Sequence, residues 1–247
     1  MVDSYQLILG DCLEKLKDIP ENSIDLVLAD PPFGQNCRLD WDKIINFPKL
    51  WIELDRVIKD TTPVILFGNQ PFTTDLINSN REWFRYEWVW DKHIPRGMNQ
   101  AKFQPMRKHE NILVFSKKYP HSYYPVMIER DKPIRRKNYD KNGKGINGKY
   151  KESQEDKWYT YTHINPNTII TGCWEKNRGK LHPTQKPVSL MEYLIDTYSK
   201  EGDTVLDFCF GSNSTGVAAI NKKRKYIGIE KDVIYYDMGL ERIKGIL

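Results

Sequence analysis

Cysteine is scarce in the 247-residue sequence, and its four copies show no Cys-x-x-Cys spacing. This argues against a zinc ribbon and against a disulfide scaffold, and it is typical of proteins from a reducing cytoplasm. Long apolar runs are missing too, because a stretch such as Val64–Phe67 is far shorter than the roughly 20 residues of a membrane span. The first residues also lack the basic and then apolar pattern of a signal peptide. We therefore expect a cytoplasmic protein without a membrane anchor.

The modest net charge of +5 hides an asymmetry along the chain. Residues 116–180 hold 15 Lys and Arg against 7 Asp and Glu, whereas the rest of the chain has a balance of −3. Tyrosines and Trp158 are interleaved with these basic groups. Cations mixed with aromatic rings suit a phosphate backbone and unstacked bases, so the segment predicts nucleic-acid binding. A solvated surface insertion is the alternative.

Both ends of the chain alternate between strand-like and helix-like patterns, whereas the periodicity fails between about residues 117 and 180. Continuous apolar runs such as Ile24–Ala29 are typical of parallel strands that are buried on both faces. Apolar residues at helical spacing, as in Pro187–Ser199, indicate amphipathic helices. The alternation predicts an α/β fold with a largely parallel sheet covered by helices on both faces.

The run Asp30-Pro31-Pro32-Phe33 directly follows the first of these apolar runs. Ligands of open α/β sheets bind at the carboxyl ends of strands. Because proline fixes φ and lacks an N–H, the segment is stiff and its carbonyls are free to accept hydrogen bonds. A carboxylate, a rigid carbonyl and an aromatic ring could together hold a planar base by its exocyclic amine. An ordinary strand-to-loop turn would account for the same residues.

A second candidate site is the small-residue turn Phe210–Gly216, which follows an apolar strand through Asp207 and opens a helix. Glycine lets a ligand approach the backbone closely, and a helix N-terminus favours an anionic group. Glu230 ends the next expected strand, where an acid commonly binds ribose hydroxyls. The turn does not match the dinucleotide pattern G-x-G-x-x-G, and the chain has no triphosphate motif G-x-x-x-x-G-K-[ST].

A third block, His182–Pro187, precedes an expected helix, and by itself it would be ordinary surface. In order along the chain, the Asp-Pro-Pro-Phe motif, the basic segment, this His-Pro-Thr-x-Lys-Pro block and the Asp207–Gly216 turn resemble the β-class amino methyltransferases of DNA. The resemblance spans nearly the whole chain. It implies a Rossmann-like methyltransferase fold with a seven-stranded, mostly parallel sheet, one antiparallel strand and a circularly permuted motif order.

The resemblance divides the chain into a catalytic half at 1–116, a target-recognition insertion at 117–180 and a cofactor-binding half at 181–247. The implied cofactor is S-adenosylmethionine, and no metal is implied. Glu230 would bind its ribose, with Asp232 as a competing choice, and the third block would lie near its methionine carboxylate. The implied cofactor-binding residues are Asp11, Cys12, Asp30, His182, Thr184, Lys186, Asp207, Phe210, Gly211, Ser212, Asn213, Ser214 and Glu230.

Three residues of the turn depart from the family pattern: Phe208, Cys209 and Asn213 stand where Pro, Phe and Gly are usual. If the backbone at position 213 needs a positive φ, asparagine is the least strained substitute for glycine. The departures predict weaker cofactor binding. They also keep open a non-catalytic DNA-binding relative with a decayed cofactor site.

For the reaction, the resemblance implies methyl transfer to the exocyclic amine of a base that is flipped out of the duplex. The Asp30 carboxylate and the Pro31 carbonyl would accept the N–H bonds of the amine, and Phe33 would stack on the base. The implied catalytic residues are thus Asp30, Pro31, Pro32 and Phe33. Aspartate rather than serine before Pro-Pro favours adenine N6, with cytosine N4 as the alternative.

Double-stranded DNA is the implied partner, and its recognition would fall on residues 117–180, assisted by the loop 96–109. Arg107 and Lys108 are expected to contact phosphates rather than bases. The resemblance leaves open whether the protein forms homodimers and whether a restriction endonuclease accompanies it. The expected DNA-binding residues are Arg96, Arg107, Lys108, Arg135, Arg136 and Lys137.

Overall fold

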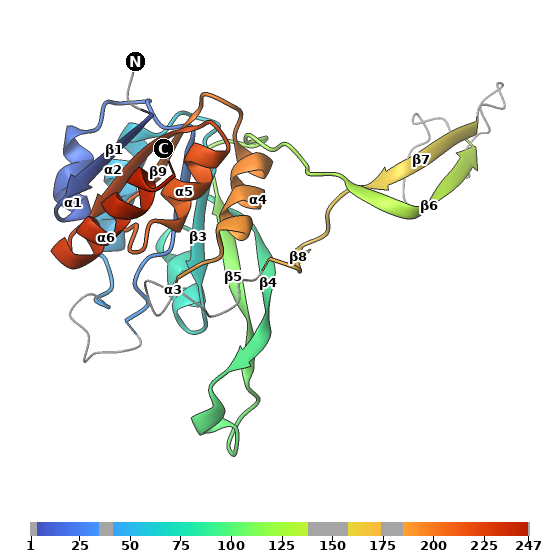
Figure 1. Ribbon diagram of the computed structural model, residues 1–247, viewed down its shortest axis with the longest axis horizontal. Coiled ribbons are helices and arrows are strands. Elements are labelled where there is room, and N and C mark those ends of the chain that lie inside the picture. Colours follow the sequence, from blue (N-terminus) through green and yellow to red (C-terminus); the bar gives the residue numbers. More distant parts are fainter. Residues whose placement is uncertain (1–3, 35–41, 138–157, 174–184, 247) are drawn as a thin grey trace. The chain divides into compact units, whose positions relative to one another are not determined.

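Figure 1 shows the computed structural model, which describes residues 4–34, 42–137, 158–173 and 185–246. The chain forms two compact units, one from Met1–Tyr124 with Thr168–Leu247 and the other from Pro125–Asn167. Within the described ranges, no helix has both the length and the apolar character that crossing a membrane requires.

The first unit is built on an eight-stranded sheet, in the strand order β1-β10-β9-β2-β3-β5-β4-β8. Only β5 runs antiparallel to its neighbours among these strands, as expected. The predicted α/β fold is confirmed, with one strand more than expected because two residues, β8, add to the edge beside β4. The strands are β1 Tyr5–Leu9, β2 Leu26–Ala29, β3 Val64–Gly68, β4 Phe84–Arg96, β5 Arg107–Phe115, β8 Ile169–Ile170, β9 Thr204–Asp207 and β10 Lys225–Glu230.

Helices cover both faces of this sheet and so bury the apolar central strands on both sides. All residues of β2 and β3 are buried, and successive side chains point into two separate apolar clusters. Val27 and Leu66 pack with the helices of one face, whereas Leu28 and Ile65 pack with those of the other. The first face carries α1 Cys12–Lys15, the 3-10 helix η1 Leu16–Asp18, α2 Phe47–Val57 and α3 Phe72–Ser79; the second carries α4 Val188–Tyr198, α5 Ser214–Asn221 and α6 Val233–Lys244.

Strands from opposite ends of the sequence lie side by side in the middle of the sheet. β2 pairs in parallel with β9, in the register Leu26 with Val205 and Val27 with Leu206. Parallel neighbours end at the same edge of a sheet, so the segments after β2 and β9 must meet there. This is the permuted order that the motif sequence predicts.

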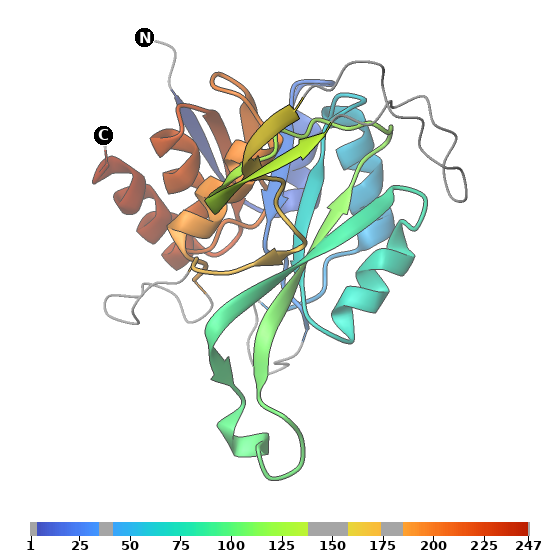
Figure 2. The same cartoon turned by 90° about the vertical axis from the view of Figure 1, so that its right-hand side faces the viewer.

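β4 and β5 form a long hairpin that extends past this same edge (Figures 1 and 2). β3 ends with Gly68 opposite Asn111, whereas the β4–β5 pairing continues out to Arg96 opposite Arg107. A short 3-10 helix, η2 Met98–Gln100, lies at the tip. The sequence predicts a loop from 91 to 110, so the outer arms of the hairpin are a difference from the expectation.

The second unit contains a two-stranded antiparallel ribbon of β6, Ile128–Lys137, and β7, Trp158–Ile164. The whole unit lies within the segment 117–180 that is expected to recognise DNA. Nearly every residue of β7 is exposed. A strand that is exposed on both faces needs no alternation of apolar and polar residues, which explains why periodicity fails here.

Candidate active site

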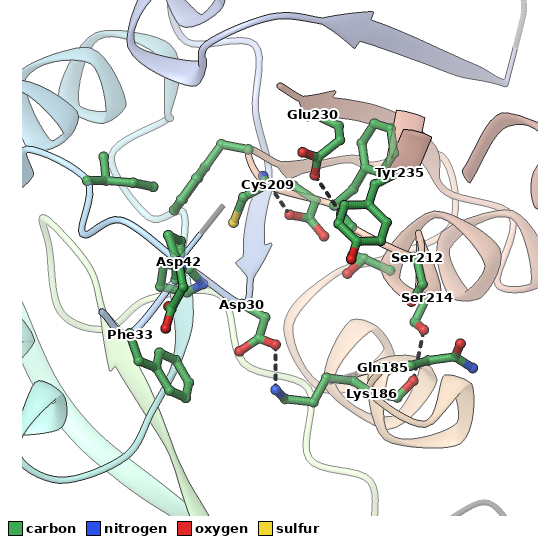
Figure 3. Close-up of a pocket in the computed structure, with 18 of the residues that line it drawn as sticks. Asp30, Phe33, Asp42, Gln185, Lys186, Cys209, Ser212, Ser214, Glu230 and Tyr235 are labelled. Carbon is green, nitrogen blue, oxygen red and sulfur yellow. Dashed lines mark hydrogen bonds and ion pairs between the residues drawn. The ribbon is translucent and has the colours of Figure 1, made fainter. Parts of the chain in front are cut away.

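A cavity of about 1020 Å³ lies where the carboxyl ends of β2, β9 and β10 meet (Figure 3). It draws on both ends of the chain, with Asp30 and Phe33 on one side and the turn after β9 on the other. Within the described residues, no group of His, Cys, Asp and Glu could hold a metal ion. Of the predicted residues, the cavity is lined by Asp11, Cys12, Asp30, Pro31, Pro32, Phe33, Arg96, Lys186, Asp207, Phe210, Gly211, Ser212, Ser214 and Glu230.

The catalytic candidate Asp30 belongs to a chain of four alternating charges. The Lys186 Nζ lies 2.5 Å from Asp30 Oδ2 and 3.3 Å from Glu110 Oε2. Lys92 Nζ in turn lies 3.0 Å from Glu110 Oε1. The other oxygen of Asp30, Oδ1, is buried and has no hydrogen-bond partner within the parts of the chain that the structure describes. A buried acceptor without a partner is costly unless a ligand supplies the donor.

Burial and pairing act against each other on these charges. Burial raises the pKa of Asp30 and the Glu110 charge adds to this, whereas the Lys186 ammonium lowers it, and the net shift is upward. Burial alone would lower the pKa of Lys186, yet the Asp30 and Glu110 carboxylates raise it above its usual range. Burial also opposes ionisation of Glu110, but Lys186 and Lys92 outweigh it and lower that pKa. Lys186 is therefore a permanent cation beside Asp30.

Phe33 contributes an aromatic ring to the same wall of the cavity. Its ring lies 4.9 Å from that of Phe72, at an interplanar angle of 31°. The backbone N–H of Gly34 donates to Asp42 Oδ1 at 2.9 Å, which holds the backbone directly after Phe33. An aromatic ring held in place at the cavity wall is suited to stacking on a planar ligand.

The turn after β9 exposes its backbone to the cavity at Gly211. Gly211 has a φ of +51°, and nothing lies within 4 Å of where its Cβ would be. Its N–H donates to Glu230 Oε2 at 2.9 Å, and the N–H of Asp232 donates to Glu230 Oε1, also at 2.9 Å. Glu230 is therefore held by two backbone donors at the end of β10. Open space beside a glycine and a fixed carboxylate fit a ligand with hydroxyl groups.

Asp207 supports this turn from the end of β9. Its Oδ1 accepts the N–H of Cys209 at 3.1 Å. Burial raises the pKa of Asp207 to about 7, although hydrogen bonds from Thr215 and Cys209 oppose the shift. Phe208 and Cys209 both line the cavity, and Phe208 is also buried in one of the apolar clusters.

Asn213 stands in the left-handed region, with a φ of +60°. This is the backbone conformation for which asparagine is the least strained substitute for the glycine that is usual in the family. Its side chain is fully buried and does not line the cavity; Nδ2 donates to the Gly239 carbonyl in α6 at 3.2 Å. The residue therefore stabilises the turn through its contact with α6, away from the cavity.

The third sequence block is described only in part. His182 and Thr184 lie outside the described residues. Lys186 lines the cavity, and its ammonium contacts Asp30 and Glu110. Its backbone carbonyl reaches the turn after β9, where it accepts the Ser214 hydroxyl at 2.8 Å.

Several cavity residues were missed by sequence reasoning, chiefly Glu110, Lys92, Asn69 and Tyr235. None belongs to a recognisable motif. Asn69 does follow directly on the apolar run of β3, the same position that Asp30 holds after β2, and this signal could have identified it. Glu110 and Lys92 enter through the β4–β5 pairing, which the sequence did not predict.

The expected DNA-binding residues fall into both units. In the first, Lys108 Nζ lies 3.1 Å from Asp91 Oδ2, and Arg107 is exposed near the Gln70 carbonyl. Arg96 lies at the outer end of β4. In the second, Arg135 packs over the Trp158 ring at 5.3 Å, and the other two are Arg136 and Lys137 on β6.

Comparison with known proteins agrees with this geometry. A family model described as "DNA methylase" (N6_N4_Mtase) matches residues 24–241. The chain is 32% identical to DNA adenine methyltransferase YhdJ of Escherichia coli (98% of this chain, 83% of the relative). It is 29% identical to Type II methyltransferase M.HinfI of Haemophilus influenzae (97% and 68%). The solved M1.HpyAVI–SAM complex matches 97% of this chain and 98% of its own at 24% identity, with a TM-score of 0.63. This protein belongs to the DNA methylase family.

Proposed function

We propose that this enzyme transfers a methyl group from S-adenosylmethionine to the N6 amine of adenine in duplex DNA. The observation that carries the proposal is the single cavity that both Asp30 and the Gly211 turn line, together with the buried and unpartnered Oδ1 of Asp30. The choice of adenine is supported by the aspartate before Pro-Pro and by the similarity to a protein named as an adenine methyltransferase.

The residues around the turn fit the cofactor. The exposed backbone at Gly211 leaves room for close approach, and the carboxylate of Glu230 is placed to accept ribose hydroxyls. Asp11 and Cys12, after β1, also line the cavity, and the family resemblance would place them near the adenine ring of the cofactor. When bound, S-adenosylmethionine supplies a methyl group activated by a positively charged sulfur.

The chain's own residues would orient the amine. Asp30 Oδ1 accepts one N–H of the flipped base and the Pro31 carbonyl accepts the other, which exposes the lone pair of the nitrogen. Phe33 stacks on the base, a contact worth about 1–3 kcal/mol. Positioning of this kind can supply about 7–11 kcal/mol of a barrier. Asp30 then receives the proton that the methylated nitrogen releases, and it need not be a strong base.

Digestion of modified DNA to nucleosides, followed by mass spectrometry, tests the reaction. We expect N6-methyladenine after incubation of duplex DNA with the enzyme and S-adenosylmethionine. N4-methylcytosine would support the alternative that the same scaffold allows, and it would contradict the adenine assignment. Absence of cofactor binding in calorimetry at millimolar concentration would favour a non-catalytic DNA-binding relative.

The outer part of the β4–β5 hairpin is our candidate for DNA contact in the first unit. Residues 92–109 contain five Lys and Arg and no Asp or Glu. They extend past the edge where the cavity lies, and Lys92 and Arg96 line the cavity itself. Phosphate contacts dominate DNA affinity, so a ribbon without acidic groups is suited to position the duplex over the cavity.

Replacing basic residues in the outer part of the β4–β5 hairpin should weaken DNA binding in a salt-dependent way. For the double variant Lys102→Gln with Arg107→Gln, we expect the slope of log K against log salt to fall by about 1.8, since each lost phosphate contact removes about 0.9. Fluorescence anisotropy with a labelled duplex at several salt concentrations measures it. The matched control is Lys222→Gln with Lys223→Gln at the end of α5, on the opposite edge of the sheet. An unchanged slope would place the DNA elsewhere.

We also propose a cytoplasmic location and two further partners, a second copy of this chain and a cognate restriction endonuclease. Light scattering of the purified protein tests for the homodimer. Resistance of DNA from expressing cells to a panel of endonucleases tests for the second partner and returns the sequence context at the same time.

A further inference from the structure

We propose that Lys186 is a positioning residue for Asp30: its ammonium holds one carboxylate oxygen so that the other faces the target amine. Resting on the proposed function, this gives the lysine of the His-Pro-Thr-x-Lys-Pro block a role other than binding the methionine carboxylate.

The geometry around Lys186 leaves its cation little to offer a further ligand. The side chain is only 6% exposed, although it lines a large cavity. Two carboxylates already contact its Nζ, Asp30 at 2.5 Å and Glu110 at 3.3 Å. The Phe67 ring lies 4.9 Å from the same atom. The Asp30 contact is a hydrogen bond and the Glu110 contact an ion pair, so a third carboxylate at this ammonium would be repelled by the two carboxylates already beside it.

The two ends of the lysine serve different parts of the site. Its backbone carbonyl accepts the Ser214 hydroxyl, which fixes it to the start of α5 beside the cofactor turn. Its side chain crosses to β2 and meets Asp30 (Figure 3). Glu110, itself braced by Lys92, holds the ammonium from the β5 side. Lys186 therefore connects the two halves of the cavity in a single residue.

Charge balance shows what the ammonium does for Asp30. Two carboxylates, Asp30 and Glu110, are matched by two ammonium groups, Lys186 and Lys92. Without Lys186, buried like charges would face one another, and such a site favours protonation of one carboxyl group. A protonated Asp30 loses acceptor capacity towards an amine.

The pH profile distinguishes this role from a cofactor contact. In Lys186→Met, the acid limb of kcat/KM, where activity is lost as Asp30 is protonated, should move to higher pH, with at least a tenfold loss at pH 7 that recovers on the alkaline side. Lys186→Arg should restore most of the profile. The Kd for S-adenosylmethionine, measured by calorimetry, should change less than about threefold. An unchanged acid limb with a Kd raised about 30-fold or more would overturn the proposal and assign the lysine to the cofactor.

Glu110→Gln supplies a second variant whose shift has the opposite sign. The Glu110 charge raises the pKa of Asp30, so its removal should move the acid limb to lower pH. This variant keeps Lys186 paired with Asp30, and it therefore tests the idea even if Lys186→Met folds poorly. Shifts of the same sign in both variants would contradict it.

A readout without turnover separates this inference from the proposed function. In protein labelled with ¹³C at the aspartate carboxyl carbon, the Asp30 resonance is identified by its loss in Asp30→Asn. Its titration midpoint should rise in Lys186→Met and fall in Glu110→Gln. If the wild type methylates no DNA, the proposed function fails, yet these midpoints still decide whether Lys186 sets the state of Asp30. Equal midpoints in all three proteins would overturn the inference.

Discussion

Asp30→Ala should abolish methyl transfer while leaving cofactor binding nearly unchanged. Asp30 lies at the end of β2 with Oδ1 buried and unpartnered among the described residues, whereas the turn that fits the cofactor follows the neighbouring strand β9. Loss of one preorganised partner of the reacting group costs about 10²–10³ in rate, and Asp30 also takes the proton. We expect a fall in kcat of at least about 10³-fold. Single-turnover transfer of labelled methyl groups measures it, and calorimetry measures the Kd of the cofactor.

The fold should survive this substitution because Lys186 keeps a partner. Its ammonium remains 3.3 Å from Glu110, so the alanine variant leaves no unpaired buried charge. Asp42→Asn is a matched control: Asp42 is a carboxylate that lines the same cavity, but it accepts the N–H of Gly34 and so holds the backbone next to Phe33. An amide oxygen can accept the same bond, and we expect less than a tenfold change in kcat. If Asp30→Ala turns over like the wild type, Asp30 is not the acceptor of the amine.

The meeting of Asp30 with the Gly211 turn could be predicted from the sequence for a simple physical reason. Both follow short runs of buried apolar residues, and parallel strands of one sheet end at one edge. The pairing of β2 with β9 then brings together segments almost 180 residues apart in sequence, as the hydrogen bond from the Thr204 N–H to Asp25 illustrates with its separation of 179. The fold class and the order of the motifs were therefore sufficient to predict that these two segments meet.

The partners of Asp30 could not be predicted in the same way. The bond from Lys186 to Asp30 spans 156 positions, and nothing in a local pattern specifies which carboxylate a lysine will meet. Glu110 reaches the site because the pairing of β4 with β5 continues past Asn111, the last residue of β5 that pairs with β3. Their outer arms are exposed on both faces, so no apolar periodicity indicates a strand. The apolar core therefore fixes where the site lies, whereas the polar pairing within it depends on three-dimensional contact.

Loss of the Glu230 carboxylate should weaken cofactor binding and also destabilise the turn. In Glu230→Ala, the N–H groups of Gly211 and Asp232 both lose their acceptor. An unsatisfied buried donor costs about 1–3 kcal/mol, so we expect the free energy of unfolding to fall by about 2–4 kcal/mol if water reaches part of the site. The direct contact with the cofactor is a bond to a charged group, worth about 1.5–3 kcal/mol, and its loss raises the Kd about 10- to 100-fold.

Asp232→Ala separates these two effects and decides between the two acids that the sequence offers for the ribose. Asp232 caps α6, since its Oδ1 accepts the N–H groups of Ile234 and Tyr235, and it does not line the cavity. Its removal should cost about 1 kcal/mol of stability, as for other N-caps, with no more than about a threefold change in the cofactor Kd. Urea unfolding gives the free energy of unfolding of each variant, and calorimetry gives its Kd for the cofactor. A larger rise in Kd for Asp232→Ala than for Glu230→Ala would move the ribose contact to Asp232. Equal losses of affinity that follow the losses of stability would mean that Glu230 only braces the turn.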